Sequence, residues 1–304
     1  MALTSQLPDL QATAVKATTR YVVITPVRDE ERFLDDTIHS ICGQTVQPAE
    51  WIIVDDGSSD QTGAIADRYA AQFPWLRAIH RPNRGFRKSG GGVVEAFYDG
   101  YRALQCSDWD FIVKLDGDLS FESDYFEKCF QYFQKIAQLG IGGGVIDHNI
   151  GGTMTPENNP RFHVRGATKI YKRDCWEAIG GLWPAAGWDT IDEVKANMLG
   201  WTTHAFPSLH LTHHRFTGTE EGLLRDRIKH GVACYVSGYH PLFVAASCVS
   251  RLTQKPRVRG SLGILYGFVK AHFTRPPRVS DRAYLAYIRG QQLRRLAGKP
   301  TIWR

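Results

Sequence analysis

Three groups of acidic residues have the types and spacing needed to hold a cation together with a polar ligand. Asp116 and Asp118 flank a glycine, residues 55–58 read Asp-Asp-Gly-Ser, and residues 29–30 read Asp-Glu. Two carboxylates spaced Asp-x-Asp project from one turn and suit a hard divalent ion, Mg²⁺ or Mn²⁺, that keeps other positions for phosphate oxygens. Each group alone could be a polar turn that ends a strand. Their recurrence favours a shared binding site.

The acidic groups must be positioned by the apolar runs that precede them. Residues 21–25, 51–54 and 111–115 are short and β-branched, and they predict buried strands separated by helical patterns over residues 30–43 and 59–73. Strands that alternate with helices predict an α/β fold, with a mostly parallel twisted sheet and helices on both faces. Ligands of such sheets bind outside the carboxyl ends of the strands, so we expect the carboxylates to converge there.

With these motifs in this order, the chain resembles the family 2 glycosyltransferases, inverting enzymes with the GT-A fold. The matching segments are 24–30 (Ile-Thr-Pro-Val-Arg-Asp-Glu), 54–60 (Val-Asp-Asp-Gly-Ser-Ser-Asp) and 115–118 (Leu-Asp-Gly-Asp). The likeness runs from about residue 20 to about residue 215. The resemblance implies transfer of a sugar from a nucleotide-diphosphate sugar, with a UDP-sugar favoured, to a glycan or lipid-linked acceptor.

By that resemblance, the nucleotide lies at the ends of the first strands. Asp56 would accept a hydrogen bond from the base, which is uracil in most of the family. Pro26, Arg28 and Glu30 would line the same pocket, and Asp116 would lie near the ribose.

Two further segments could contact the rest of the donor. Arg84 and Lys88 lie in a glycine-rich loop that permits close backbone approach to the diphosphate. The alternative interpretation of the same sequence is a solvated basic connector. Gly166 and Ala167 resemble the small-residue stretch on which the donor sugar rests, and the alternative is an ordinary strand glycine.

The metal site implied by the resemblance begins with Asp118. Some GT-A enzymes add a histidine from the strand that corresponds to residues near 210, so His213 or His214 could complete the site for Mg²⁺ or Mn²⁺. The competing interpretation is a structural histidine.

Inverting transfer needs a base that removes the proton of the acceptor hydroxyl. The family places it in a Glu-Asp pair roughly eleven residues before a helix-ending glycine. Counting back from Gly200 puts Asp189 on the base and Trp188 in place of the Glu. Asp192 and Glu193 lie within one turn and are alternative bases, and acids also favour the first turn of a helix without any catalytic role.

The C-terminal part of the chain differs in charge from the rest. The whole chain of 304 residues carries a net charge of +6, but residues 251–304 hold 13 Lys or Arg and one acid, a net charge of +12. With its apolar helical stretches, this segment could lie on an anionic membrane surface or remain a solvated surface. It has no aromatic platform or motif for nucleic acid, so we expect no nucleic-acid partner.

These patterns divide the chain into three parts. We expect an N-terminal extension at residues 1–19, a GT-A domain at 20–220 with a nucleotide-binding half (20–120) and an acceptor half (121–220), and a helical basic section at 221–304. No secretory signal and no CxxC pair are evident among the six cysteines. A cytoplasmic protein, peripheral at the inner face of the cell membrane, is the expected localisation.

Two other functions remain compatible with the motifs. A metal-dependent phosphohydrolase could use Asp116 as nucleophile and Asp118 as acid, but it would leave the Asp55-Asp56 pair unexplained. A catalytically degenerate nucleotide-sugar-binding protein is the other alternative, if Trp188 disables the acceptor side.

Overall fold

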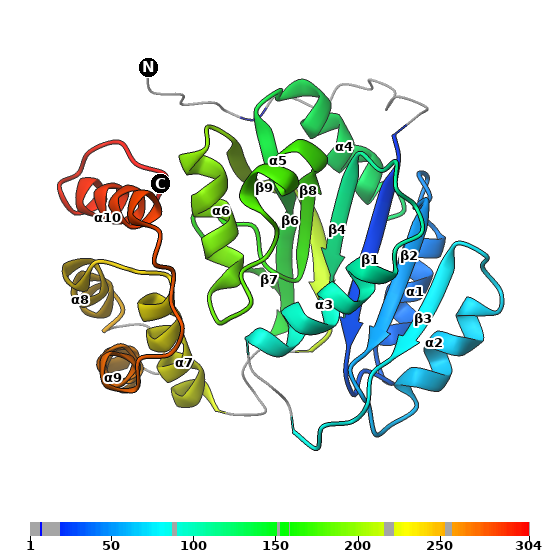
Figure 1. Cartoon of the computed structure of the whole chain (residues 1–304), viewed down its shortest axis with the longest axis horizontal. Coiled ribbons are helices and arrows are strands. Elements are labelled where there is room, and N and C mark those ends of the chain that lie inside the picture. Colours follow the sequence, from blue (N-terminus) through cyan, green and yellow to red (C-terminus); the bar gives the residue numbers. More distant parts are fainter. Residues whose placement is uncertain are drawn as a thin grey trace.

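The computed structural model of the chain describes residues 7, 19–86, 90–150, 153–157, 159–215, 222–252 and 257–303. Within these residues, nine strands form one sheet in the order β3-β2-β1-β4-β8-β6-β9-β5, and β7 pairs with β6 (Figure 1). The strands are β1 (Tyr21–Val27), β2 (Glu50–Asp55), β3 (Leu76–His80), β4 (Phe111–Leu115), β5 (Leu119–Phe121), β6 (Leu139–Ile150), β7 (Thr153–Pro156), β8 (Thr168–Lys172) and β9 (Thr202–His213).

Strand direction changes across the sheet. The neighbours β3-β2, β2-β1, β1-β4 and β6-β9 are parallel. The strand β8 runs antiparallel to both β4 and β6, and β5 runs antiparallel to β9. The parallel group brings the carboxyl ends of β1, β2 and β4 to one edge, as expected from the acidic motifs.

Helices cover both faces of the sheet and extend beyond it. They are α1 (Leu34–Cys42), α2 (Thr62–Ala70), α3 (Gly91–Ala103), α4 (Tyr125–Lys135), α5 (Arg173–Ile179), α6 (Trp188–Met198), α7 (Leu223–Val236), α8 (Pro241–Ser250), α9 (Arg257–Thr274) and α10 (Arg282–Leu296).

Alternate residues of the strands pack into two separate hydrophobic cores, one on each face of the sheet. In β1, Tyr21 and Val23 pack with apolar residues of α1, α2 and α4, whereas Val22 and Ile24 pack with those of α3, α5 and α6. Successive strand side chains point to opposite faces, so a strand that is buried on both sides is apolar throughout. The predicted α/β class, with helices on both faces of a GT-A-like sheet, is confirmed.

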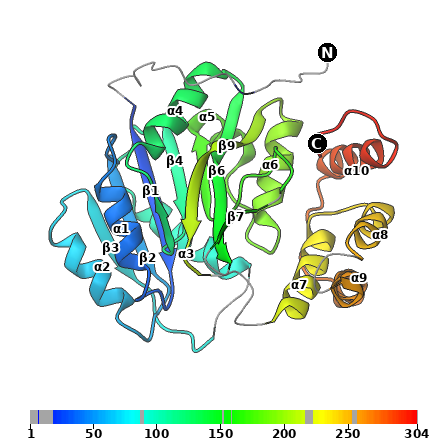
Figure 2. The same ribbon diagram turned by 180° about the vertical axis from the view of Figure 1, so that it is seen from behind.

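The C-terminal helices α7 to α10 form a further layer beside α6, at the end of the molecule away from β3 (Figures 1 and 2). A third core, which includes Phe162, Ile191, Ile264 and Trp303, joins this layer to the sheet domain. The helix α8 begins at Pro241, and the His240 side chain accepts a hydrogen bond from the backbone N–H of Leu242. None of the described helices has the length and apolar character needed to cross a bilayer.

The expected N-terminal extension lies almost wholly outside the described residues, and so does the boundary near residue 220. The division of the chain at these two points stays a prediction.

Candidate active site

The turn after β2 depends on a glycine. Gly57 has a φ of 71°, and a Cβ atom on it would lie 2.5 Å from Cα of Asn83. Only glycine allows the loops after β2 and β3 to approach this closely without strain. This contact places Asp56 beside the basic segment that follows β3.

Asp56 is the centre of a group of arginines at the carboxyl end of β2. Its carboxylate pairs with Arg81 and Arg84, and its backbone carbonyl accepts a 2.7 Å hydrogen bond from Arg28. The other Arg28 nitrogen donates to Oδ1 of Asn83 at 2.9 Å. The structure therefore brings Arg28, Asp56 and Arg84 together, with Arg84 against the carboxylate expected to bind the base.

Pro26 and Glu30 lie beside this group at the end of β1. Pro26 is buried within the strand, and Glu30 Oε2 lies 2.9 Å from Nη2 of Arg215. Asp29, the residue before Glu30, has a φ of 54°, which is rare for a residue other than glycine. Its carbonyl accepts a 2.6 Å hydrogen bond from Arg215, so a distant part of the chain holds this turn.

The Asp-Gly-Asp turn follows β4 and is packed without spare room. A Cβ atom on Gly117 would lie 2.4 Å from Cγ1 of Val27, so glycine is required there. The carboxylate of Asp116 pairs with the buried Lys114, and its backbone N–H donates a 2.9 Å hydrogen bond to the carbonyl of Ala167. Asp116 and the predicted donor-sugar segment therefore meet.

Asp118 faces His213 and not His214. Asp118 Oδ2 lies 3.0 Å from Nε2 of His213, and both side chains are buried. The ring of His214 instead lies 2.9 Å from Oγ of Ser120 and stacks on Phe33. Of the two histidines suggested by the sequence, His213 is the one that shares a site with Asp118.

A divalent cation would fit between Asp118 and His213 because one carboxylate oxygen of Asp118 lacks a partner among the described residues. Oδ1 of Asp118 is buried and has no hydrogen-bond partner in the described parts of the chain, which a metal ion would satisfy. Those parts contain no cluster of three or more His, Cys, Asp or Glu arranged to hold a metal. The protein thus offers a carboxylate and an imidazole, and diphosphate or water oxygens would supply the remaining ligands.

The amino end of α6 lies against the predicted donor-sugar segment at Gly166. A Cβ atom on Gly166 would lie 2.8 Å from the Trp188 ring and 3.3 Å from Cβ of Asp189. The ammonium groups of Lys114 and Lys169 each lie 5.6 Å from the centre of that ring. Trp188 therefore connects the Asp-Gly-Asp turn, the Gly166 segment and the predicted base.

Asp189 lies in an electropositive setting. Burial alone would raise the pKa of Asp189, but the positive charges of His163 and Lys169 outweigh it and hold that pKa below its usual value. Lys169 also donates a hydrogen bond to the backbone carbonyl of Asp189.

The two alternative bases are already engaged. Asp192 is 2% exposed, and its carboxylate accepts hydrogen bonds from Lys169, at 2.8 and 2.9 Å, and from Tyr171 at 2.5 Å. Glu193 is fully buried and binds Nδ1 of His163 at 2.8 Å and the backbone N–H of Val164 at 2.6 Å.

Sequence reasoning missed the two buried lysines of the site. Lys114 and Lys169 each stand inside an apolar strand, and a charged residue in such a run is rarely buried without a partner. That signal could have pointed to Asp116 and Asp192 as their partners. The predicted diphosphate contact from Lys88 lies outside the described residues.

Comparison with known proteins agrees with this architecture. The sequence profile of glycosyl transferase family 2 matches residues 22–185. EpsH of Bacillus subtilis (strain 168) is 26% identical over 204 residues, which cover 60% of this chain and 55% of EpsH. An undecaprenyl-phosphate mannosyltransferase of Micrococcus luteus is 27% identical over 154 residues, 51% of this chain and 59% of the enzyme. The chain thus spans less than two thirds of the length of either relative.

A solved structure shares the fold. The mannosyltransferase PcManGT from Pyrobaculum calidifontis, in complex with GDP-Man and Mn²⁺, superposes with a TM-score of 0.55 over 97% of this chain and 79% of PcManGT, at 17% identity. At this identity the likeness concerns the fold alone. Because the family profile covers more than half of the chain and its acidic motifs lie together at one sheet edge, the chain belongs to glycosyl transferase family 2.

Proposed function

We propose that this protein transfers a sugar, with inversion, from a nucleotide-diphosphate sugar to an acceptor hydroxyl. The observation that carries the proposal is the convergence of three segments: Asp116 is hydrogen-bonded to Ala167, Gly166 adjoins Asp189, and Asp118 faces a histidine. These contacts between the residues predicted separately for the donor, the metal and the base support the proposal.

Asp118 and His213 are the residues that would hold Mg²⁺ or Mn²⁺. The bound ion would neutralise charge on the departing diphosphate. Arg28 and Asp56 would bind the nucleotide base together with Pro26 and Glu30, and Asp116 would lie by the ribose. Arg84 already pairs with Asp56, which supports a role in orienting that carboxylate.

Asp189 is the preferred base because its carboxylate is the available one. Asp192 and Glu193 are buried and already accept hydrogen bonds from Lys169, Tyr171 and His163, so neither is free to bind an acceptor hydroxyl. Asp189 makes no ion pair with any described residue. Its lowered pKa keeps it deprotonated at neutral pH, ready to accept the proton of the acceptor hydroxyl.

The replacement Asp189→Asn tests this assignment. We expect sugar transfer to fall by about 10²- to 10⁴-fold, the usual contribution of a general base, with Mn²⁺-dependent nucleotide binding retained. Transfer is measured by release of UDP or GDP in the presence of acceptor, and binding by calorimetry. Both nucleotides are tested because the family resemblance favours UDP and PcManGT was solved with GDP-Man.

A matched control separates catalysis from helix stability. Asp174 stands exposed in the first turn of α5, as Asp189 stands in the first turn of α6, so Asp174→Asn should leave transfer unchanged. Asp118→Asn should abolish the enhancement of nucleotide binding by Mn²⁺. If the wild type binds no nucleoside diphosphate with Mn²⁺ and instead hydrolyses phosphate monoesters, the phosphohydrolase alternative is correct. Binding without transfer to any acceptor would favour the degenerate binding protein.

The C-terminal helices support association with an anionic membrane surface. Six exposed apolar side chains of α9 recur at spacings of three and four and so form one stripe on the outer face of the helix: Val258, Leu262, Leu265, Tyr266, Val269 and Phe273. Arg259 and Lys270 are exposed beside this α9 stripe. An apolar face bordered by basic residues is typical of a helix that lies in the bilayer interface. We place the protein at the cytoplasmic face of the membrane as a peripheral enzyme.

A further inference from the structure

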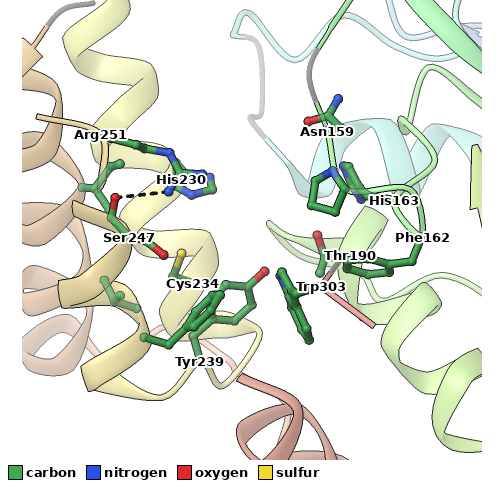
Figure 3. Close-up of a pocket in the computed structure, with 14 residues that line it drawn as sticks. Asn159, Phe162, His163, Thr190, His230, Cys234, Tyr239, Ser247, Arg251 and Trp303 are labelled. Atoms are coloured by element: carbon green, nitrogen blue, oxygen red, sulfur yellow. Dashed lines mark hydrogen bonds between the residues drawn. The ribbon is translucent and has the colours of Figure 1, made fainter. Parts of the chain in front are cut away.

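A cavity of about 170 Å³ lies between the sheet domain and the C-terminal helices (Figure 3). His163 and Thr190 line it from the side of α6, and Tyr239, Arg251 and Trp303 line it from the C-terminal side. None of these residues belongs to the donor site described above. The cavity therefore needs an explanation of its own.

One part of the cavity wall is aromatic. Trp303 packs against Phe162, Phe243 and Tyr239, with ring centres 5.0, 5.7 and 6.0 Å apart. Aromatic rings present rigid apolar surface, and the hydroxyl of Tyr239 adds a polar edge. Such a wall suits the apolar face of a sugar ring.

Another part is cationic, and its arginine forms no ion pair with the described residues. Arg251 donates a long hydrogen bond of 3.4 Å to the carbonyl of Ser247, and no described carboxylate pairs with it. His230 stands beside it on the cavity wall (Figure 3). A guanidinium without a carboxylate partner is a ready donor to phosphate oxygens.

The environment of His230 shows the same excess of positive charge. His230 is exposed to solvent and lines the cavity. Desolvation by the surrounding protein, and then the charges of Arg251 and Arg227, lower the pKa of His230. A bound anion would offset that repulsion.

The cavity adjoins the proposed base. Thr190, the neighbour of Asp189 on α6, lines it. The charge of Asp189 raises the pKa of His163 and opposes the lowering of the pKa of His230. The carboxylate of Asp189 thus acts on both histidines of the cavity wall, and Thr190 links the cavity to the proposed base.

We propose that this cavity is the acceptor subsite and that it takes a sugar bearing a phosphate, with the phosphate on Arg251 and His230 and the sugar against Trp303. The inference rests on the proposed transferase function. In the reaction, the acceptor hydroxyl oxygen bonds to the anomeric carbon and its proton passes to Asp189. The anomeric C–O bond to the diphosphate breaks, and the diphosphate leaves with the electron pair. The acceptor phosphate serves only as an anchor.

Two probes distinguish the sources of such a phosphate. Glucose 1-phosphate, measured by calorimetry, represents a free sugar phosphate. Phosphatidylcholine vesicles containing a few mole per cent of a polyprenyl-diphosphate sugar, measured by co-sedimentation, represent a lipid-linked one. Wild-type binding in one arm identifies that source, and absence of binding in both arms overturns the proposal.

Arg251→Gln should weaken the binding that the wild type shows by about 10- to 100-fold, the usual loss for a hydrogen bond to a charged group. Arg251→Lys should recover part of it, because it keeps the charge. Arg225→Gln, which removes the same charge from an exposed position on α7, should bind like the wild type. The subsite would be refuted if a folded Arg251→Gln protein bound the probe as tightly as the wild type. It would also be refuted if Arg225→Gln weakened binding as much as Arg251→Gln does.

The donor site provides the check on the underlying function. Mn²⁺-dependent nucleotide binding should be the same in Arg251→Gln as in the wild type. If Arg251→Gln binds nucleotide normally and also binds the phosphate probes as tightly as the wild type, only the proposed acceptor subsite is refuted. If the wild type binds no nucleotide, the transferase proposal itself fails.

Discussion

Trp188 shows how one residue can depart from a family pattern and still serve the site. It stands where the resemblance leads us to expect Glu, and its ring lies under the ammonium groups of Lys114 and Lys169. The face of an indole ring attracts cations, so the aromatic side chain partly compensates for a missing carboxylate. The same ring packs against Gly166, so it confines the predicted donor-sugar segment from one side.

The charged residues beneath Asp189 form a buried network. Lys169 and Glu193 are fully buried and Asp192 nearly so, and His163 completes the group. Removing one partner of a buried ion pair leaves an uncompensated charge, so every member depends on the others. This network orients α6, and through α6 it positions Asp189.

The contribution of His163 to this network should depend on pH. Burial opposes protonation of His163, but the charges of Glu193 and Asp189 outweigh burial and the repulsion from Lys169, so the pKa of His163 is raised above 6.5. A raised histidine pKa stabilises the folded state fully below the unfolded pKa, and this stabilisation is lost as pH rises through the folded value.

We therefore expect the free energy of unfolding of the wild type to exceed that of His163→Gln most at about pH 6, since each unit of pKa shift corresponds to about 1.4 kcal/mol. The difference should shrink as the pH rises above 6.5. Urea denaturation of both proteins between pH 6 and pH 9 measures it. A difference that stays constant or grows with pH would contradict the raised pKa.

At the scale of elements, α7 and α9 pack through glycines. A Cβ atom on Gly267 would lie 2.0 Å from the carbonyl oxygen of Ile228, and one on Gly231 would lie 2.0 Å from that of Ile264. The two helix backbones therefore approach more closely than any side chain would allow. This contact builds the C-terminal layer and places Ile264 on the wall of the cavity.

Gly267→Ala should separate these helices and lower the free energy of unfolding by about 1–3 kcal/mol, the usual cost of overpacking. Gly290→Ala is the matched control, because it also lies within a helix but a Cβ there meets nothing within 4 Å. The control should gain about 0.5–1 kcal/mol from reduced backbone entropy in the unfolded state. Thermal melting of both variants gives the comparison, and equal effects would argue against close α7–α9 packing.

At the scale of the whole molecule, the charge is divided between two regions. The first 250 residues hold 24 basic and 30 acidic residues, whereas the last 54 have a net charge of +12. The helices α7 to α10 gather at one end of the molecule (Figure 2). A basic, partly apolar end attached to a mildly acidic body would orient the protein on an anionic surface.

Flotation with anionic vesicles tests this orientation. The wild type should float with phosphatidylglycerol-containing vesicles at low salt and less well at about 0.5 M salt, where screening is stronger. Leu262→Asp, within the α9 stripe, should reduce binding by about 10- to 100-fold, since burial of a leucine contributes about 1.5–3 kcal/mol. Leu199→Asp is the control, because Leu199 is a similarly exposed leucine (46% against 59%) at the end of α6. Equal loss in both variants would show that the stripe is not the contact.

The order of strands and helices in the first half was predictable from the sequence, because fully apolar strands and one-sided helical patterns leave few other ways to bury a core. The positions of the acidic motifs followed, since parallel strands end at one sheet edge. The choice between His213 and His214 was not predictable, because adjacent side chains at the end of a strand point in different directions and only the pairing of β9 with β5 decides which one meets Asp118.

The same holds for Asp189, Asp192 and Glu193, which share one turn of α6. Their sequence spacing makes them equivalent candidates, and the partners that distinguish them, Lys169 and His163, come from segments more than twenty residues away. The cavity likewise could not be predicted from the sequence, because residues as far apart as Thr190 and Trp303 form its wall. Local pattern determines which segments become strands or helices, whereas side-chain partners are set by packing between distant segments, and only the tertiary structure decides those.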